Sequence, residues 1–144
     1  MDPLIQLALE TRQRAYAPYS NFLVGAAVEC ENGSMFAGCN VENASYGLAI
    51  CAERVALTTA VAAGQQKFRR IVVTASPQAA PCGACRQFIA QFGSHIQVIC
   101  VDATEPQQQQ SWTIAELLPQ SFCWPAGSSS PIDLKDHQDD SSSG

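Results

Sequence analysis

The chain has 144 residues, 47% of them hydrophobic, and a formal net charge of −5, which suits one globular domain with a buried core. Four Asp and one Lys after position 125 supply −3 of this charge, so the rest of the chain carries only −2. This body has no basic stripe to neutralise phosphates, which makes nucleic acid a poor candidate partner. No apolar run reaches the roughly 18 residues that a membrane span needs.

The first half of the chain predicts a helix followed by a β-hairpin. Asp2 can cap a helix over residues 3–15, and Pro3 suits its first turn. Asn32-Gly33 is a strong hairpin turn between two short, largely apolar segments. These segments are predicted strands at residues 23–31 and 35–41, and a loop follows at residues 42–48.

The second half alternates between helices and buried strands. Good helix formers fill residues 51–63, where Gly64 is placed to end the helix. Further on, Thr113 can cap a short helix that ends before Pro119, and the glutamines at 107–110 suit a solvated loop. The other predicted elements are strands at residues 71–75 and 96–101 and a helix at residues 82–92. This order indicates an α/β fold, a mixed sheet with helices on both faces.

Composition divides the chain into residues 1–125, a folded domain, and residues 126–144, a polar acidic tail that we expect to be disordered. Seven cysteines are an odd number for disulfides, and the N-terminus lacks a basic and then apolar secretory signal. We therefore expect a reducing, cytoplasmic location. There, closely spaced cysteines indicate metal or redox chemistry.

Two segments about thirty residues apart carry that chemistry, Cys51-Ala52-Glu53-Arg54 and Pro81-Cys82-Gly83-Ala84-Cys85-Arg86-Gln87. Cys82 and Cys85, at i and i+3, share one helical face, and all three cysteines lie at predicted helix starts, where the dipole favours thiolates. They predict one zinc ion per chain, held by Cys51, Cys82 and Cys85, with the fourth position open to water. Glu53, beside that position, would transfer the protons of the water.

Three thiolates exceed the charge of zinc by one. Arg54 and Arg86 each follow a ligand closely in sequence, and we expect them to donate to the sulfurs and offset the excess. Two other interpretations stay open: a redox-active Cys-x-x-Cys pair, or a structural metal with Cys39 or Cys100 as fourth ligand. The four cysteines outside the two segments, Cys30, Cys39, Cys100 and Cys123, lie singly in or near apolar runs. We interpret them as small buried hydrophobic residues and not as ligands. Neither histidine has a ligand-like setting.

The two segments follow the established signature of zinc-dependent deaminases, with Cys in place of the first His. With three further segments, the chain resembles the small cytidine deaminases that act on free nucleosides, over about residues 4–124. These segments are Tyr19-Ser20-Asn21-Phe22-Leu23-Val24-Gly25-Ala26-Ala27, Asn40-Val41-Glu42-Asn43-Ala44-Ser45-Tyr46 and Leu117-Leu118-Pro119.

The resemblance implies a three-layer α/β/α fold and a homotetramer whose active sites take residues from neighbouring subunits. It also implies a set of substrate-binding residues: Phe22 near the base, Asn40 and Glu42 at the ribose hydroxyls, Ala52 at the substrate, and Tyr46 and Phe122 reaching a neighbouring site. The alternatives are that Phe22 belongs to the core and that Asn40 and Glu42 only shape a turn. The C-terminal end departs from the expected pattern, which leaves the part played by Phe122 open.

The expected function is hydrolytic deamination of cytidine and 2′-deoxycytidine in pyrimidine salvage. A blasticidin S deaminase, or another deaminase of cytosine nucleosides, is the alternative. A polynucleotide deaminase is disfavoured by the charge and by Cys51 as first ligand.

Overall fold

The computed structural model describes residues 1–122. The predicted tail, residues 126–144, and the last three residues of the predicted domain lie outside the described residues. The elements in chain order are α1 (Pro3–Arg12), β1 (Gly25–Cys30), β2 (Met35–Cys39), a 3₁₀ turn (Tyr46–Leu48), α2 (Ala52–Ala62), β3 (Phe68–Ala75), α3 (Gly83–Ala90), β4 (Gln97–Asp102), β5 (Gln109–Thr113) and α4 (Ile114–Leu117). No helix in residues 1–122 is long and apolar enough to cross a membrane.

The five strands form one mixed sheet in the order β2-β1-β3-β4-β5. The β3–β4 pair is parallel and the other pairs are antiparallel. The predicted mixed sheet is therefore confirmed, but the solvated loop predicted at residues 107–110 is wrong for Gln109 and Gln110, which begin β5. Their polar side chains do not show the apolar pattern that predicts a strand. β5 is an edge strand, and its backbone pairing with β4 holds it in place without buried side chains at these two positions.

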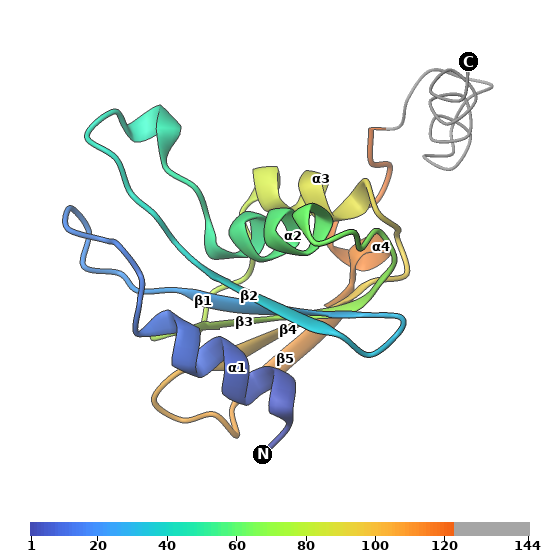
Figure 1. The fold of residues 1–144 in the computed structure, drawn as a ribbon, viewed down its shortest axis with the longest axis horizontal. Coiled ribbons are helices and arrows are strands. Elements are labelled where there is room, and N and C mark those ends of the chain that lie inside the picture. Colours follow the sequence, from blue (N-terminus) through green and yellow to red (C-terminus); the bar gives the residue numbers. More distant parts are fainter. Residues whose placement is uncertain (123–144) are drawn as a thin grey trace.

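Helices cover both faces of the sheet, as predicted (Figure 1). Helix α1 packs on one face, while α2 and α3 lie on the other. Neighbouring residues of β3 pack on opposite faces of the sheet, because successive side chains of a strand alternate in direction. Val72 joins the core with Leu4 and Ala8 of α1, whereas Val73 joins the core with Ala56 of α2.

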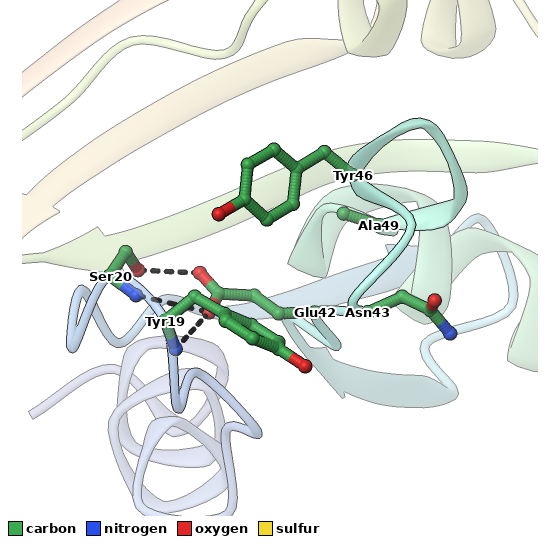
Figure 2. A pocket seen from close by; sticks show the side chains of 6 residues that line it. All are labelled: Tyr19, Ser20, Glu42, Asn43, Tyr46 and Ala49. Carbon is green, nitrogen blue, oxygen red and sulfur yellow. Dashed lines mark hydrogen bonds between the residues drawn. The ribbon is translucent and has the colours of Figure 1, made fainter.

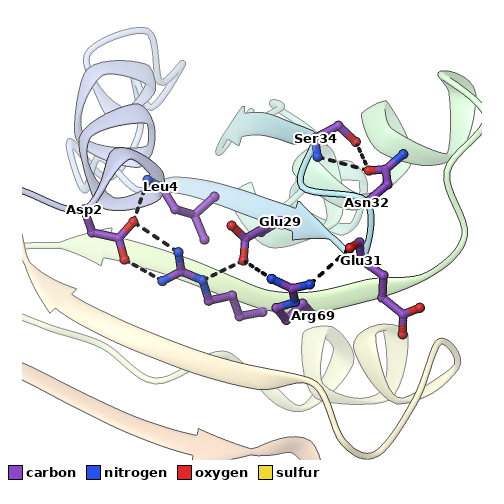
Figure 3. Close-up of polar contacts among 8 residues, drawn as sticks. Asp2, Leu4, Glu29, Glu31, Asn32, Ser34 and Arg69 are labelled. Atoms are coloured by element: carbon purple, nitrogen blue, oxygen red, sulfur yellow. Dashed lines mark hydrogen bonds and ion pairs between the residues drawn. The ribbon is translucent and has the colours of Figure 1, made fainter.

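The capping residues behave as the sequence predicts. The Asp2 side chain accepts from the Leu4 backbone at 2.9 Å and also binds Arg70, which ties the start of α1 to β3 (Figure 3). Thr113 and Glu116 form a reciprocal capping box at α4. Gly64 follows α2 with φ of 97°, the left-handed conformation that glycine adopts without strain.

Helix α1 ends at Arg12, three residues before the predicted end. Residues 13–15 form tight turns instead, with i to i+3 hydrogen bonds. The next residue, Tyr16, then exchanges backbone hydrogen bonds with Asn40 and Glu42. This non-local pairing pulls the chain away from the helix axis, so the helix cannot continue to residue 15.

Gly38 brings α2 against β2. A Cβ atom at this position would lie 2.8 Å from the Ala52 carbonyl oxygen and closer still to the Ala56 backbone nitrogen. Only a residue without a side chain permits this approach. The first turn of α2, which carries Glu53, is therefore seated directly on the sheet.

Candidate metal centre

Three cysteine sulfurs meet where α2 and α3 begin. Cys51 is the N-cap of α2, Cys82 is the N-cap of α3, and Cys85 lies in the first turn of α3. Their sulfur atoms all lie within 4.8 Å of one another, and those of Cys51 and Cys82 are 3.8 Å apart. The structure thus brings the three predicted ligands together. A redox pair would require only Cys82 and Cys85, and not the nearby sulfur of Cys51.

The cluster fits zinc. Tetrahedral Zn–S bonds of about 2.3 Å place two sulfurs about 3.8 Å apart, close to the Cys51–Cys82 separation. Within residues 1–122, no His, Asp, Glu or further Cys joins the three sulfurs as a fourth donor. Cys39 and Cys100, the alternatives for a structural site, are outside the group. Three protein ligands and one open position are the arrangement of catalytic zinc sites.

The surroundings favour the thiolate form of Cys51. The hydrogen bond from Cys85, followed by contacts with Arg54 and Cys82, lowers the pKa of Cys51 to about 5. The same Cys51–Cys85 contact, with burial, raises the pKa of Cys85. The Arg54 Nη2 atom lies 3.6 Å from the Cys51 sulfur, which agrees with its predicted donation to a ligand.

Arg86 does not make the predicted donation to a sulfur. Its Nε donates to the Pro81 carbonyl at 2.8 Å, and its Nη1 donates to the Leu117 carbonyl at 3.0 Å. The loop before Cys82 and the end of α4 each leave a backbone carbonyl that needs a hydrogen-bond donor. The Arg86 guanidinium lies within reach of both carbonyls and binds them in place of a sulfur. Arg86 therefore braces the loop that carries Cys82 against the C-terminal segment.

Glu53 is a buried carboxylate beside the sulfurs. It lies in the first turn of α2 and is only 4% exposed. Burial, followed by the negative charge of Cys51, raises the pKa of Glu53 to about 7, although a hydrogen bond with Cys85 acts in the opposite direction. A group with such a pKa gains and loses protons readily near neutral pH. Ala52, next to it, is fully buried.

Asn40 and Glu42 hold the loop that leads into β1. The Asn40 side chain accepts from the Val24 amide and donates to the Phe22 carbonyl, both at 2.9 Å. The Glu42 carboxylate accepts from the Tyr19 and Ser20 backbone amides, at 2.9 and 3.2 Å, and from the Ser20 hydroxyl. Both side chains therefore shape the loop, as the alternative interpretation expects, and Phe22 is 36% exposed and not part of the core.

A hollow of about 320 Å³ opens beside Glu42 (Figure 2). Its walls come from two loops far apart in sequence, and they are formed by Tyr19, Ser20, Glu42, Asn43, Tyr46 and Ala49. The rings of Tyr19 and Tyr46 meet edge to face with centroids 6.0 Å apart. Sequence reasoning assigned no role to Ser20, although a serine two residues before Phe22 was a signal for a local side-chain hydrogen bond.

Two of the predicted residues lie on the surface of the chain. Tyr46 is 76% exposed and Phe122 is 74% exposed. Tyr46 still contacts Tyr19 of its own chain, and the Gln87 side chain donates to the Phe122 carbonyl at 3.3 Å. Neither side chain is therefore part of the core of its own chain.

A profile of the cytidine and deoxycytidylate deaminase zinc-binding region matches residues 2–101, which hold all three sulfurs and Glu53. The chain belongs to this deaminase family. Its members include a probable cytidine deaminase of Dictyostelium discoideum, 47% identical over 70% of each chain. The cytidine deaminase of Sporosarcina psychrophila is 39% identical over 85% of this chain and 90% of its own.

The fold also matches solved members of the deaminase family. The crystal structure of cytidine deaminase from Burkholderia pseudomallei covers 83% of this chain and 96% of its own, with 45% identity and a TM-score of 0.77. The structure from Mycobacterium leprae gives 38% identity and a TM-score of 0.70. The predicted α/β fold with a mixed sheet is therefore confirmed, and so is a zinc-dependent deaminase.

Proposed function

We propose that the chain deaminates free cytidine and 2′-deoxycytidine to uridine and 2′-deoxyuridine, with release of ammonia. The observation that carries the proposal is a buried carboxylate, Glu53, directly beside three clustered sulfurs that leave one metal position open. The names of the relatives, cytidine deaminases at up to 47% identity, support the same substrate class.

Cys51, Cys82 and Cys85 would hold the zinc, and Arg54 would offset the excess charge of three thiolates. When bound, zinc supplies a Lewis acid that lowers the pKa of water toward neutrality. Glu53 would take a proton from the water and deliver it to N3 of the cytosine ring, while the water oxygen bonds to C4. It would then take the second proton from that oxygen and pass it to the amino group at C4, so that the C4–N bond breaks and ammonia leaves. A pKa of about 7 suits both transfers.

Phe22 and Ala52 would contact the base, and Asn40 and Glu42 the ribose hydroxyls. The exposure of Phe22 and the position of Glu42 in the wall of the hollow support these roles. A carboxylate and an amide that already share their hydrogen bonds with a loop offer fixed acceptors. Such acceptors favour a substrate that carries the hydroxyls, because each hydroxyl adds a hydrogen bond to a fixed partner.

The near-neutral charge of the body favours a free nucleoside over a polynucleotide. The test is the ultraviolet absorbance change of cytidine on mixing with purified protein, with and without a chelator and after zinc is restored. Blasticidin S and a cytosine-containing single-stranded oligonucleotide serve as competing substrates. Faster turnover of either one than of cytidine would reject the proposed substrate.

The active enzyme in this proposal is a homotetramer in which Tyr46 and Phe122 reach neighbouring sites. Exposed apolar side chains in and next to the two loops that form the hollow, and at the end of the described residues, support such contacts; they are Tyr16, Tyr19, Tyr46, Leu48, Ile50 and Phe122. Light scattering of the eluted peak in size-exclusion chromatography measures the assembly directly. A monomer that turns over cytidine at full rate would reject shared sites.

Residues 1–125 would form the catalytic domain, with residues 126–144 as a separate tail. The family match lies entirely within the proposed domain. A chain that ends at position 125 is expected to keep its zinc and its activity. Loss of either, in a protein that remains folded, would assign the tail to the domain. Zinc-binding thiols must stay reduced, which suits the expected cytoplasmic location.

A further inference from the structure

One serine hydroxyl joins two residues of the proposed substrate site. The Ser20 Oγ donates to Oε2 of Glu42 and accepts from the Phe22 backbone amide at 3.0 Å. The Ser20 backbone amide also donates to Oε1 of the same carboxylate, at 3.2 Å. Figure 2 shows the Ser20 and Glu42 side chains pointing toward each other at the edge of the hollow.

The backbone around Ser20 is fixed for this contact. Asn21 has φ of 57°, the left-handed conformation that Asn tolerates better than other residues with a side chain. Its amide donates to the Ala17 carbonyl at 2.9 Å, which closes the turn. The turn therefore presents the Ser20 hydroxyl to Glu42 and directs Phe22 onward from the same point.

The hydrogen bonds on Glu42 are unequal between its two oxygens. Among residues 1–122, Oε1 accepts from two backbone amides, whereas Oε2 accepts only from the Ser20 hydroxyl. Each carboxylate oxygen has about two acceptor positions, so Oε2 keeps one for a donor in the hollow. A sugar hydroxyl is a donor of this kind. The hydrogen bond from Ser20 also holds the pKa of Glu42 below its usual value, which keeps the acceptor charged.

We propose that Ser20 is a positioning residue for substrate selection: its hydroxyl fixes the Glu42 carboxylate so that the free position of Oε2 meets a ribose hydroxyl of the substrate. The inference rests on the proposed function, because it takes Glu42 as the group that binds the ribose. Ser20 itself need not touch the nucleoside. Its effect should be confined to substrates that carry the ribose hydroxyls.

The experiment compares two substrates in three variants. Cytidine carries both ribose hydroxyls, and 2′,3′-dideoxycytidine carries neither. Ser20→Ala is expected to raise KM for cytidine roughly five- to twentyfold, with kcat nearly unchanged. This is less than the full loss of a hydrogen bond to a charged group, because Glu42 remains and is only held less firmly. KM for the dideoxy substrate should remain the same. Ser20→Thr keeps the hydroxyl and should restore most of the affinity for cytidine.

Ser34→Ala is the matched control. The Ser34 hydroxyl also bonds a neighbouring side chain, Asn32, but in the hairpin turn between β1 and β2 (Figure 3), and Ser34 does not line the hollow. It should change KM for neither substrate. Thermal unfolding of each variant shows whether Ser20→Ala remains folded. If it does not, the KM values of Ser20→Thr and the wild type are compared for the two substrates, and a KM for cytidine that is clearly raised in Ser20→Thr overturns the inference.

The outcomes separate the inference from the proposed function. If Ser20→Ala raises KM equally for both substrates, or for neither, while Glu42→Gln penalises only cytidine, Ser20 does not position Glu42 and the inference is overturned. If Glu42→Gln itself affects the two substrates alike, the ribose role of Glu42 fails, and the inference fails with it. If Ser20→Thr is as impaired as Ser20→Ala, the hydroxyl is not the group that acts.

Discussion

The sulfur atoms of Cys51 and Cys82 lie 3.8 Å apart although 31 positions separate the residues in sequence. Each residue is the N-cap of a helix, so α2 and α3 direct their N-terminal ends at the same point. The positive ends of both helix dipoles favour thiolates there. The metal centre is thus built by the meeting of two helix starts, and four measurements test it and the fold around it.

Glu53→Gln removes the proposed proton carrier and keeps the shape of the side chain. Turnover of cytidine should fall by at least the roughly 10²–10⁴-fold that general acid–base catalysis supplies. The measurement is the ultraviolet assay, together with zinc content. Glu105→Gln, in an exposed loop, is the control and should retain wild-type turnover. A folded, zinc-loaded Glu53→Gln enzyme with normal turnover would remove Glu53 from the mechanism.

Cys82→Ala removes one of the three sulfurs, so the protein should lose zinc and activity together. Elemental analysis after dialysis gives the zinc content per chain. Cys39→Ala also removes a half-buried thiol, but one outside the cluster, and should keep one zinc per chain. One zinc per chain in Cys82→Ala would mean that Cys82 is not a ligand.

Gly38→Ala places a methyl group against the backbone of α2. Because backbone cannot move as a flexible side chain does, the helix must shift or the fold must weaken, by about 1–3 kcal/mol for overpacking of this kind. Urea unfolding measures the change. Gly47→Ala is the control, because a Cβ there meets nothing within 4 Å. Equal stability of the two variants would contradict the close approach of α2 and β2.

Asp2→Asn tests the pH dependence of stability. The hydrogen bond from Arg70 lowers the pKa of Asp2, so the ion pair stabilises the fold above the unfolded pKa of about 3.9 and is lost as the pH falls through the lower folded value. Asn can still cap α1, which isolates the charge. The variant should lose about 1 kcal/mol of stability at pH 7, a value limited by partial exposure of the pair, and progressively less as the pH falls through the folded pKa of Asp2.

Urea unfolding at pH 7, 4 and 2 measures this difference. Glu10→Gln, which removes a carboxylate that forms no ion pair with another described residue, serves as the control. A destabilisation of Asp2→Asn that is the same at all three pH values would assign the effect to the cap or to packing, not to the charge.

Local sequence was a good guide wherever the structure depends on neighbouring residues. The capping of α1 and α4, the Asn32-Gly33 hairpin and the glycine after α2 all follow from hydrogen bonds and dihedral angles within a few positions. The prediction failed at β5 and at the end of α1. Both depend on backbone pairing with distant segments, which composition and periodicity do not report.

The sequence by itself determined which sulfur and carboxylate groups could form the site and how they are spaced. Cys82 and Cys85, at positions i and i+3 of a helix start, share one face whatever the rest of the fold does. Tertiary structure alone decided that two helix starts meet, that Arg86 holds backbone carbonyls in place of sulfurs, and that Ser20 reaches Glu42. These contacts join residues about 20 or more positions apart, or depend on which of several nearby acceptors lies in reach. They are fixed by the order of the strands and the packing of the helices upon them.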